Sequence, residues 1–279
     1  MKIKKAAIIG MGFIGGSIGR ALLDRGITDE VAGVCRRQTS LDRAIKQKVL
    51  TAGYVNNYRE AVSGADIVFI ATPVHVIKDV LTGLAGVIEG GAIVTDVGST
   101  KKDIVESAAR LKDSFSFVGG HPLAGSERSG VECADGELFR GSLCVLTRDR
   151  STREQDLARV KALWAAMGAK VEVLSPGKHD EVVAFTSHLP HVLAYSLVGA
   201  QKKEYRKYMS TGFKDTSRIA SSDPVLWNGI LMSNRESVLD SIERFKETLA
   251  GIEEALRQGD ARALETRLSD YKKVRDEIL

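Results

Sequence analysis

Hydrophobic residues follow two kinds of pattern in the first part of the chain. Short apolar runs alternate with longer stretches in which apolar side chains recur every three or four positions. The short runs predict buried strands at residues 6–9, 31–36, 66–71, 92–95, 115–118, 142–147 and 170–174. The longer stretches predict helices at residues 14–23, 74–87, 101–111 and 154–167. Such alternation is typical of a parallel sheet with right-handed helical crossovers.

The pattern changes at residue 175, beyond which no further run predicts a strand. Ser175 and Pro176 mark a helix start, because a hydroxyl caps the first turn and proline suits it. We expect a helix from there to about residue 201. Pro190 lies inside it and should bend it, leaving the carbonyl of Thr186 without its usual donor.

The last part of the chain is predicted to be a long amphipathic hairpin. From Val238 onward, apolar residues recur at spacings of four and three, with a break at Gly259. The narrow apolar seam can pack within the chain or against a partner helix. We predict that it contributes to a homodimer formed through the helical half.

The first predicted strand runs into a G-x-G-x-x-G motif at residues 10–15. Gly10 permits a tight turn, Gly12 lets the backbone approach a pyrophosphate, and Gly15 lets the next helix pack closely. These glycines, with Phe13 and Ile14 between them, are predicted to bind a dinucleotide. The alternative is a glycine-rich turn in another α/β fold. We expect an α/β Rossmann-type dinucleotide-binding domain over residues 1–174, followed by an all-α domain over residues 175–279.

The end of the second predicted strand distinguishes between the two nicotinamide dinucleotides. A site for NAD carries Asp or Glu there, which accepts hydrogen bonds from the ribose hydroxyls. This chain has Arg36, Arg37 and Ser40 instead, and a guanidinium matches a phosphate in geometry and charge. We predict a preference for NADP, with NAD use possible; the alternative is that the two arginines are a solvated pair.

In open parallel sheets, ligands bind beyond the carboxyl ends of the strands. That edge brings Thr72 and Pro73 to the predicted cofactor site and places Ser99 nearby. Ser99 either caps the helix that follows, or belongs to the site, or does both.

Residues 119–127 also reach this edge, in what we expect to be a polar loop after a strand. The segment contains His121, Ser126 and Glu127. Loops at strand ends are where site residues usually lie, so His121 is a candidate for acid–base chemistry. The alternative is a turn whose histidine only caps a neighbour.

A second group of polar residues surrounds Pro190. Asp180, Ser187 and His191 fall at helical spacing on one face, with His188 at its edge. Two histidines three apart can hold a metal, but no third ligand stands at a supporting spacing, so we expect no metal. Two buried structural histidines are the alternative to a functional role.

The segment 211–218 has a glycine break, both signs of charge and several hydroxyls, unlike a core helix. Arg218 can hold a carboxylate bidentately or form a surface ion pair. The first alternative would give the chain a recognition group for an anionic substrate.

Composition narrows the function classes. The net charge is +4, from 40 basic and 36 acidic residues, which is too mild for nucleic-acid binding but suits a small anionic ligand. The 3 cysteines show neither metal-like nor redox-pair spacing, so we expect reduced thiols and a cytoplasmic location. No signal peptide and no apolar run of membrane-spanning length is expected, and therefore no membrane partner.

Five motifs together resemble the prephenate/arogenate dehydrogenase family of tyrosine biosynthesis. They occur in the family's order and cover nearly the whole chain: residues 10–15, 96–101, 120–127, 187–191 and 212–218. The resemblance implies NAD(P)-dependent oxidative decarboxylation of prephenate to 4-hydroxyphenylpyruvate. Hydride leaves the carbon that bears the ring hydroxyl, CO2 departs, and the ring becomes a phenol.

The resemblance also assigns roles to residues. His121 resembles the family's partner for the substrate hydroxyl, with Ser99 beside it. The residues that resemble substrate-binding or supporting groups are His191, Arg218, His188, Glu127, Ser126 and Asp215.

Other functions stay open at the level of sequence. Arogenate dehydrogenase and a dual-substrate cyclohexadienyl dehydrogenase share these motifs, and the substrate preference is not determined by them. Dehydrogenases of the 3-hydroxyacid or 6-phosphogluconate type share the glycine motif, but their catalytic lysine has no convincing match here. A redox sensor that binds NADP without turnover would not need His121, His191 and Arg218 together.

Overall fold

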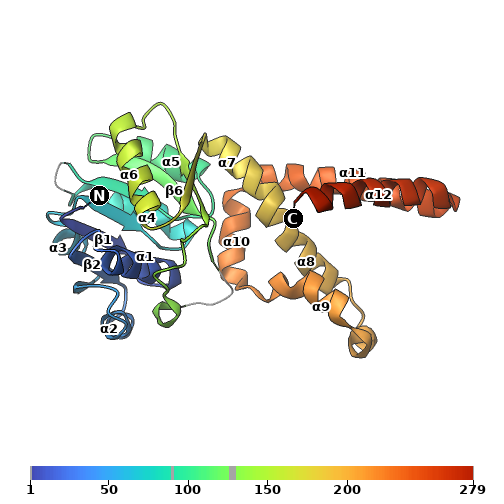
Figure 1. Ribbon diagram of the computed structural model, residues 1–279, viewed down its shortest axis with the longest axis horizontal. Coiled ribbons are helices and arrows are strands. Elements are labelled where there is room, and N and C mark those ends of the chain that lie inside the picture. The colour runs from blue at the N-terminus through green and yellow to red at the C-terminus, as the bar shows by residue number, and fades with distance from the viewer. Residues whose placement is uncertain (1, 89–90, 126–129, 279) are drawn as a thin grey trace. The chain divides into compact units, whose positions relative to one another are not determined.

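The structure is a computed structural model that describes residues 2–88, 91–125 and 130–278 (Figure 1). The chain packs as two compact units, Met1–Asn234 and Arg235–Leu279. The first unit contains a sheet and the helices packed on it, and the second is a helical hairpin.

The described residues form an eight-stranded sheet with the strand order β3-β2-β1-β4-β5-β6-β7-β8. Neighbouring strands are parallel except for β6 and β7, which are antiparallel. The strands are β1 (Lys5–Ile9), β2 (Glu30–Cys35), β3 (Ala52–Val55), β4 (Ile67–Ile70), β5 (Ile93–Asp96), β6 (Ser116–Pro122), β7 (Leu143–Thr147) and β8 (Lys170–Leu174). The mostly parallel α/β fold expected from the sequence is therefore confirmed.

Helices cover both faces of this sheet. They are α1 (Phe13–Asp24), α2 (Gln38–Lys46), α3 (Tyr58–Val62), α4 (Val74–Ala85), α5 (Lys102–Ala109) and α6 (Glu154–Ala166). Side chains of α1, α2 and α6 form one apolar core, and side chains of α3, α4 and α5 form the other. Along β1, Ile8 faces the first core and Ile9 faces the second. Because both faces are buried, the central strands are continuous apolar runs rather than alternating ones.

Strand β6 is longer than its apolar pattern. The sequence predicted a strand at 115–118 and a loop after it, whereas β6 continues to Pro122. The reason is antiparallel pairing with β7, in which His121 lies opposite Val145 and Pro122 opposite Cys144. The expectation that His121 lies in a loop was therefore wrong, and the residue is held in a strand.

The kink expected near Pro190 is a π-helical turn. Helix α7 (Pro176–Val183) passes through this turn, Ala184–His188, into α8 (Leu189–Gly199), so that Pro190 lies in the first turn of α8. A proline at that position needs no backbone N–H, and the wider turn accommodates its ring. Such a turn adds one residue, which rotates everything after it by about 100°. The sequence grouping of Asp180, Ser187 and His191 on one face assumed a continuous α-helix and does not hold.

The helical segment Pro176–Gly199 has 24 residues and is predominantly apolar. By length and composition alone it is the one helical stretch in the described ranges that is long enough to cross a membrane. The expectation that no segment reaches that length was therefore wrong, although core helices of soluble proteins pass the same test.

Four further helical segments, two of them short turns, follow α8 in the first unit. A turn at Lys203–Tyr208 leads to α9 (Thr211–Ser217), and a turn at Arg218–Ser221 leads to α10 (Pro224–Ser233). Ile230 of α10 packs into the core formed by α3, α4 and α5. Helices α7 to α10 thus belong to the same compact unit as the sheet. The last strand ends at Leu174, whereas the division between the two units lies after Asn234. The domain boundary at 174/175 stays a prediction.

The second unit is the expected hairpin. Helix α11 (Arg235–Gln258) and helix α12 (Ala261–Glu277) are joined at Gly259, whose φ is +66°. The carboxylate of Asp260 caps α12 by accepting a hydrogen bond from the Ala263 amide at 2.9 Å.

Candidate active site

The glycine loop has the geometry that a dinucleotide needs. Gly10 has a φ of +101°, and a Cβ there would lie 2.6 Å from the carbonyl oxygen of Ala71. A Cβ on Gly15 would clash with the carbonyl oxygen of Gly10. Gly12 faces open space at the start of α1, and its helix begins without a side-chain cap. The first amides of α1 are thus left to a ligand, and an anion is favoured at that position.

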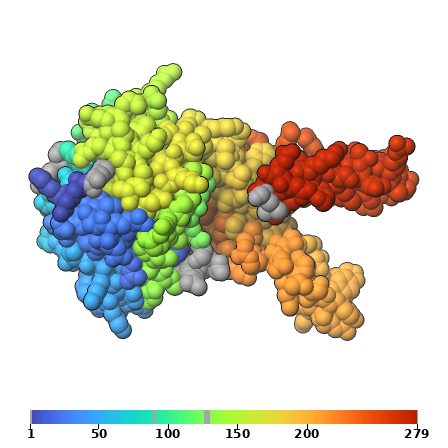
Figure 2. All heavy atoms as spheres, in the orientation of Figure 1, coloured from blue at the N-terminus to red at the C-terminus, as the bar shows by residue number. Residues whose placement is uncertain are grey.

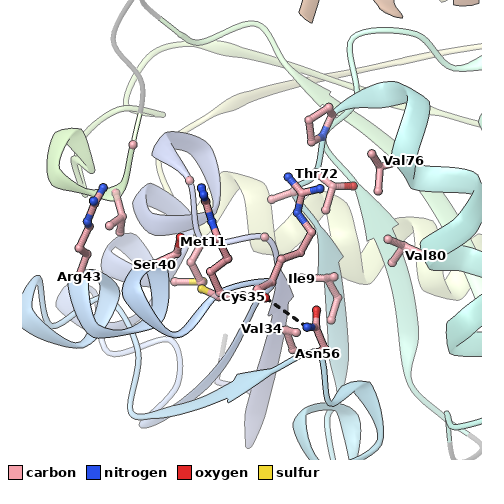
Figure 3. Close-up of a pocket in the computed structure, with 18 of the residues that line it drawn as sticks. Ile9, Met11, Val34, Cys35, Ser40, Arg43, Asn56, Thr72, Val76 and Val80 are labelled. Atoms are coloured by element: carbon pink, nitrogen blue, oxygen red, sulfur yellow. Dashed lines mark hydrogen bonds between the residues drawn. The ribbon is translucent and has the colours of Figure 1, made fainter. Parts of the chain in front are cut away.

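A cavity of about 350 Å³ opens beside this loop (Figure 3). Ser40 and Arg43 of α2 line one side, and Thr72, Val76 and Val80 line the other (Figure 3). The predicted cofactor residues among its lining are Gly10, Gly12, Arg36, Arg37, Ser40, Thr72 and Pro73. Phe13, Ile14 and Gly15 lie in the first turn of α1 behind the loop.

The hydroxyl of Thr72 is consistent with a polar ligand in this cavity, which Thr72 lines. Its Oγ1 is buried and has no hydrogen-bond partner among the described residues. A buried polar atom without a partner is unfavourable, so its presence in the cavity is consistent with a ligand that bonds to it. With the glycine cradle, it makes the cavity fit a dinucleotide.

Two further residues that line the cavity, Arg43 and Asn56, were not identified from the sequence. Arg43 lines it together with Arg36 and Arg37, and forms an ion pair with Glu132 at 3.3 Å. The amide of Asn56 donates to the carbonyl oxygen of Arg36 at 3.1 Å (Figure 3). Arg43 lies one helical turn after Ser40, a spacing that could have identified it.

His121 is the first member of a buried hydrogen-bonded chain. Its Nδ1 lies 2.9 Å from Nε2 of His179, which is fully buried. Nδ1 of His179 in turn lies 2.7 Å from a carboxylate oxygen of Asp180. His179 was not identified from the sequence, although its neighbour in the chain is Asp180 and both follow a predicted helix start.

Asp180 is fixed by the start of α5. Its carboxylate accepts hydrogen bonds from the backbone amides of Lys101 at 2.7 Å and Lys102 at 2.9 Å. A carboxylate at a helix N-terminus satisfies free amides and opposes the helix dipole. Lys101 is the N-cap residue of α5, so Ser99 does not cap this helix, and that alternative role is excluded.

A buried ion pair lies where the ends of β5 and β6 meet in the site. Lys101 Nζ and the carboxylate of Asp96 are both fully buried and bond to each other. Asp96 also accepts hydrogen bonds from the amides of Gly98 at 2.8 Å and Gly120 at 3.1 Å. The segment that carries Ser99 is thereby joined to the strand that carries His121.

The histidines of this site are neutral at neutral pH. Burial, followed by the nearby His179, Lys101 and His188, holds the pKa of His121 well below its usual range. Burial likewise lowers the pKa of His179 and lowers the pKa of His188 to about 4. A neutral imidazole has one nitrogen that donates and one that accepts, so each ring has a defined polarity.

Asn234, which was not identified from the sequence, connects His188 to Asp180. The Asn234 amide donates to the carbonyl oxygen of Asp180 at 2.7 Å and lies 3.1 Å from Nδ1 of His188. His188 is buried, and it belongs with the network that surrounds His121.

His191 has a different environment. Its Nδ1 lies 3.0 Å from the carbonyl oxygen of Ser187, so Nδ1 carries the proton and Nε2 is an acceptor. The ring stacks on Trp227 with centroids 3.4 Å apart. This position leaves one ring nitrogen for a ligand.

The remaining predicted residues lie elsewhere. Asp215 on α9 and Arg218 in the turn after it are exposed, and α9 (orange) lies at the surface (Figure 2). Ser126 and Glu127 fall outside the described residues. In the described ranges, no group of three His, Cys, Asp or Glu side chains is placed to hold a metal.

The fold, the glycine cradle and the histidine network together are those of a Rossmann-type, dinucleotide-dependent dehydrogenase. Two family models match: "Prephenate dehydrogenase, nucleotide-binding domain" over residues 18–173 and "Prephenate dehydrogenase, dimerization domain" over residues 175–270. The chain belongs to the prephenate dehydrogenase family.

Individual relatives agree with this. The chain is 36% identical to a prephenate dehydrogenase of Lactococcus lactis, over 98% of this chain and 77% of that protein. A crystal structure of prephenate dehydrogenase from Aquifex aeolicus with hydroxyphenyl propionate and NAD+ matches with a TM-score of 0.94 and 32% identity, covering 100% of this chain and 99% of that one. An arogenate dehydrogenase from Synechocystis matches with a TM-score of 0.86 and 29% identity, covering 99% and 100%.

Proposed function

We propose that this chain oxidatively decarboxylates prephenate to 4-hydroxyphenylpyruvate, with hydride transfer to a nicotinamide dinucleotide, in tyrosine biosynthesis. Two observations support the proposal: the family to which the chain belongs, and the neutral state of His121 within the buried histidine network. Bound at the glycine loop, the cofactor supplies the hydride acceptor. The chain's own residues must then accept a hydrogen bond from the substrate hydroxyl, hold its carboxylates and exclude water.

His121 is proposed as the hydroxyl acceptor, with Ser99 beside it on the segment tied to β6. A hydroxyl that becomes a phenol loses electron density to the ring as hydride departs, so an acceptor at its proton stabilises the transition state. A protonated His121 could not accept, which makes the neutral form active. The low pKa of His121 therefore keeps the site active over the neutral range.

The proposed substrate-binding groups are His191, Arg218, His188, Ser126, Glu127 and Asp215. Arg218 is proposed to hold a substrate carboxylate, because a guanidinium pairs with a carboxylate bidentately. His191 is proposed to contact the substrate through Nε2, since its Nδ1 is engaged by Ser187.

The decisive assay follows formation of the reduced dinucleotide when prephenate is added to the purified protein. Turnover with release of CO2 and 4-hydroxyphenylpyruvate is expected. Binding of dinucleotide without turnover of prephenate or arogenate would contradict the proposal and favour a redox sensor.

We further propose that NADP is preferred over NAD. Arg36, Arg37, Arg43 and Ser40 all line the cavity, so a 2′-phosphate would find positive charge and a hydroxyl donor there. The carboxylate among the lining residues, Glu132, is paired with Arg43. A kcat/KM for NAD equal to or above that for NADP would contradict this preference.

Arogenate is the second candidate substrate, because of the likeness to the Synechocystis arogenate dehydrogenase. The two substrates differ in a keto group and an ammonium on the side chain. Initial rates with each, at the same concentration of NADP, would assign the preference or show dual use.

We propose that the enzyme is a cytoplasmic homodimer formed through its helical half. The name of the second family model, a dimerization domain, supports this. So do the exposed apolar side chains of the first unit's helices, with Val198 45%, Val225 68% and Met232 60% exposed. A monomeric mass by light scattering at micromolar concentration would contradict it.

A further inference from the structure

The direction of every hydrogen bond from Asp180 to His121 follows from the chemistry of the groups. A carboxylate only accepts, and Asp180 already accepts from two backbone amides. The contact of 2.7 Å between its oxygen and Nδ1 of His179 therefore requires that Nδ1 carries a proton. Because burial keeps His179 neutral, its other nitrogen, Nε2, has no proton and can only accept.

The same logic then applies to His121. Its Nδ1 lies 2.9 Å from the bare Nε2 of His179, so His121 must donate from Nδ1. A neutral ring has a single N–H, which leaves Nε2 of His121 bare. We infer that His179 and Asp180 are positioning residues that fix the tautomer of His121, so that its Nε2 is the hydrogen-bond acceptor presented to a substrate hydroxyl.

The opposite tautomers are excluded by the surroundings. If Nδ1 of His179 were bare, its lone pair would face a buried carboxylate that cannot turn away. The backbone amides of Lys101 and Lys102 hold the carboxylate of Asp180, and the side chain of Asn234 holds the backbone carbonyl of the same residue. Fixing a histidine through a buried carboxylate is an arrangement known from serine proteases, where it holds the catalytic ring in the productive tautomer.

Burial and the surrounding charged and titratable groups together lower the pKa of both rings. His121 is faced by His179, Lys101 and His188, which all disfavour a positive charge on it. His179 is faced by Lys101, which also disfavours its charge, and by the acidic Asp180 and Asp96, which favour it; burial outweighs both. Both rings are thus neutral at neutral pH, which the assignment of protons requires.

The inference rests on the proposed function only for the use of Nε2, and the tautomer itself can be measured without substrate. The chain has 5 histidines, so ring nitrogens labelled with ¹⁵N give a spectrum that single replacements can assign. In the full-length protein with NADP bound, we expect His121 to be protonated at Nδ1 and bare at Nε2 at neutral pH. A proton on Nε2 of His121 would overturn the inference.

Two replacements of His179 separate positioning from packing. In His179→Gln the side-chain amide can donate to Asp180 and accept from His121, which keeps the same polarity. We expect the Nδ1–H tautomer to persist and kcat to fall no more than about 10-fold. In His179→Phe no acceptor remains, so the tautomer should be lost and kcat should fall about 100-fold or more, with the Kd for NADP unchanged.

His75→Gln is the matched control, because His75 lies on α4 outside this network, and it should change neither the His121 signals nor kcat. A His179→Phe protein that keeps the Nδ1–H tautomer would refute the positioning role. If that variant fails to fold, the spectra of the wild type and His179→Gln still decide the tautomer. If the spectra are as expected but neither prephenate nor arogenate is turned over, the proposed function fails and the tautomer assignment stands.

Discussion

Replacing Lys101 with methionine should destabilise the protein far more than replacing Lys78, although each lysine pairs with an aspartate. The Lys101–Asp96 pair is fully buried, whereas Lys78 and Asp103, 2.9 Å apart, are 48% and 44% exposed. Removing Lys101 leaves the Asp96 carboxylate inside the protein, with the amides of Gly98 and Gly120 as its remaining partners among the described residues.

The magnitudes follow from this difference in burial. Breaking a buried pair on one side typically destabilises by about 3–5 kcal/mol, because an uncompensated charge remains. An exposed pair contributes at most about 1 kcal/mol. Lys101→Met should therefore lose about 3–5 kcal/mol of unfolding free energy and Lys78→Met about 1 kcal/mol or less.

Urea unfolding at neutral pH, followed by circular dichroism and fitted for both midpoint and slope, measures these differences. The double variant Asp96→Asn with Lys101→Met removes both charges and should recover at least half of the loss. A Lys101→Met protein within about 1 kcal/mol of Lys78→Met, at equal slope, would refute the reasoning. So would a double variant less stable than the single one.

Four other outcomes are expected. His121→Asn should lower kcat by about two to four decades without changing the Kd for NADP, and wild-type kcat would contradict the assigned role. In the wild type, kcat/KM should stay level from neutral pH downward and fall only well below pH 6.5, because the neutral form of His121 is active. A fall in kcat/KM centred above pH 6.5 would contradict this role of His121. The pKa of His188 is about 4 in the folded protein and near 6.5 in the unfolded chain. The free energy of unfolding should therefore fall by roughly 3 kcal/mol as the pH drops from 6.5 to 4. A His188→Gln protein whose free energy of unfolding falls as much over that pH range would contradict this. Arg218→Ala should mainly raise KM, and an unchanged KM would argue against its carboxylate contact.

The sheet was predictable because its central strands are buried on both faces. Continuous apolar runs identify β1 and β4 without knowledge of their partners. The short β3, α2 and α3 were missed, since β3 is only half-buried and has no such run. The true end of β6 was missed because it is set by pairing with β7 rather than by local pattern.

The site divides in the same way. The glycine loop is a local motif with a recognisable spacing between a strand and a helix, so the sequence identified it, although Ala71 also packs against Gly10. His179 and Asp180 act on residues 58 and 79 positions away, through packing that no local pattern contains. Asn234 was missed for the same reason. Lys101 and Asp96 are only 5 positions apart, but no local pattern shows that both side chains are buried and paired.

The π-helical turn at Ala184–His188 makes the length of this segment a functional constraint in its own right. In an uninterrupted α-helix, His191 would be turned by about 120° from His179, whereas the extra residue reduces that angle to about 20°. Deleting one residue, such as the exposed Thr186, would restore regular helical winding. The ring of His191 would then turn away from its stacking position on Trp227. Point substitutions at Thr186 should therefore be tolerated where a deletion is not, and insertions or deletions in this helix should be rarer than its exposed side chains alone would imply.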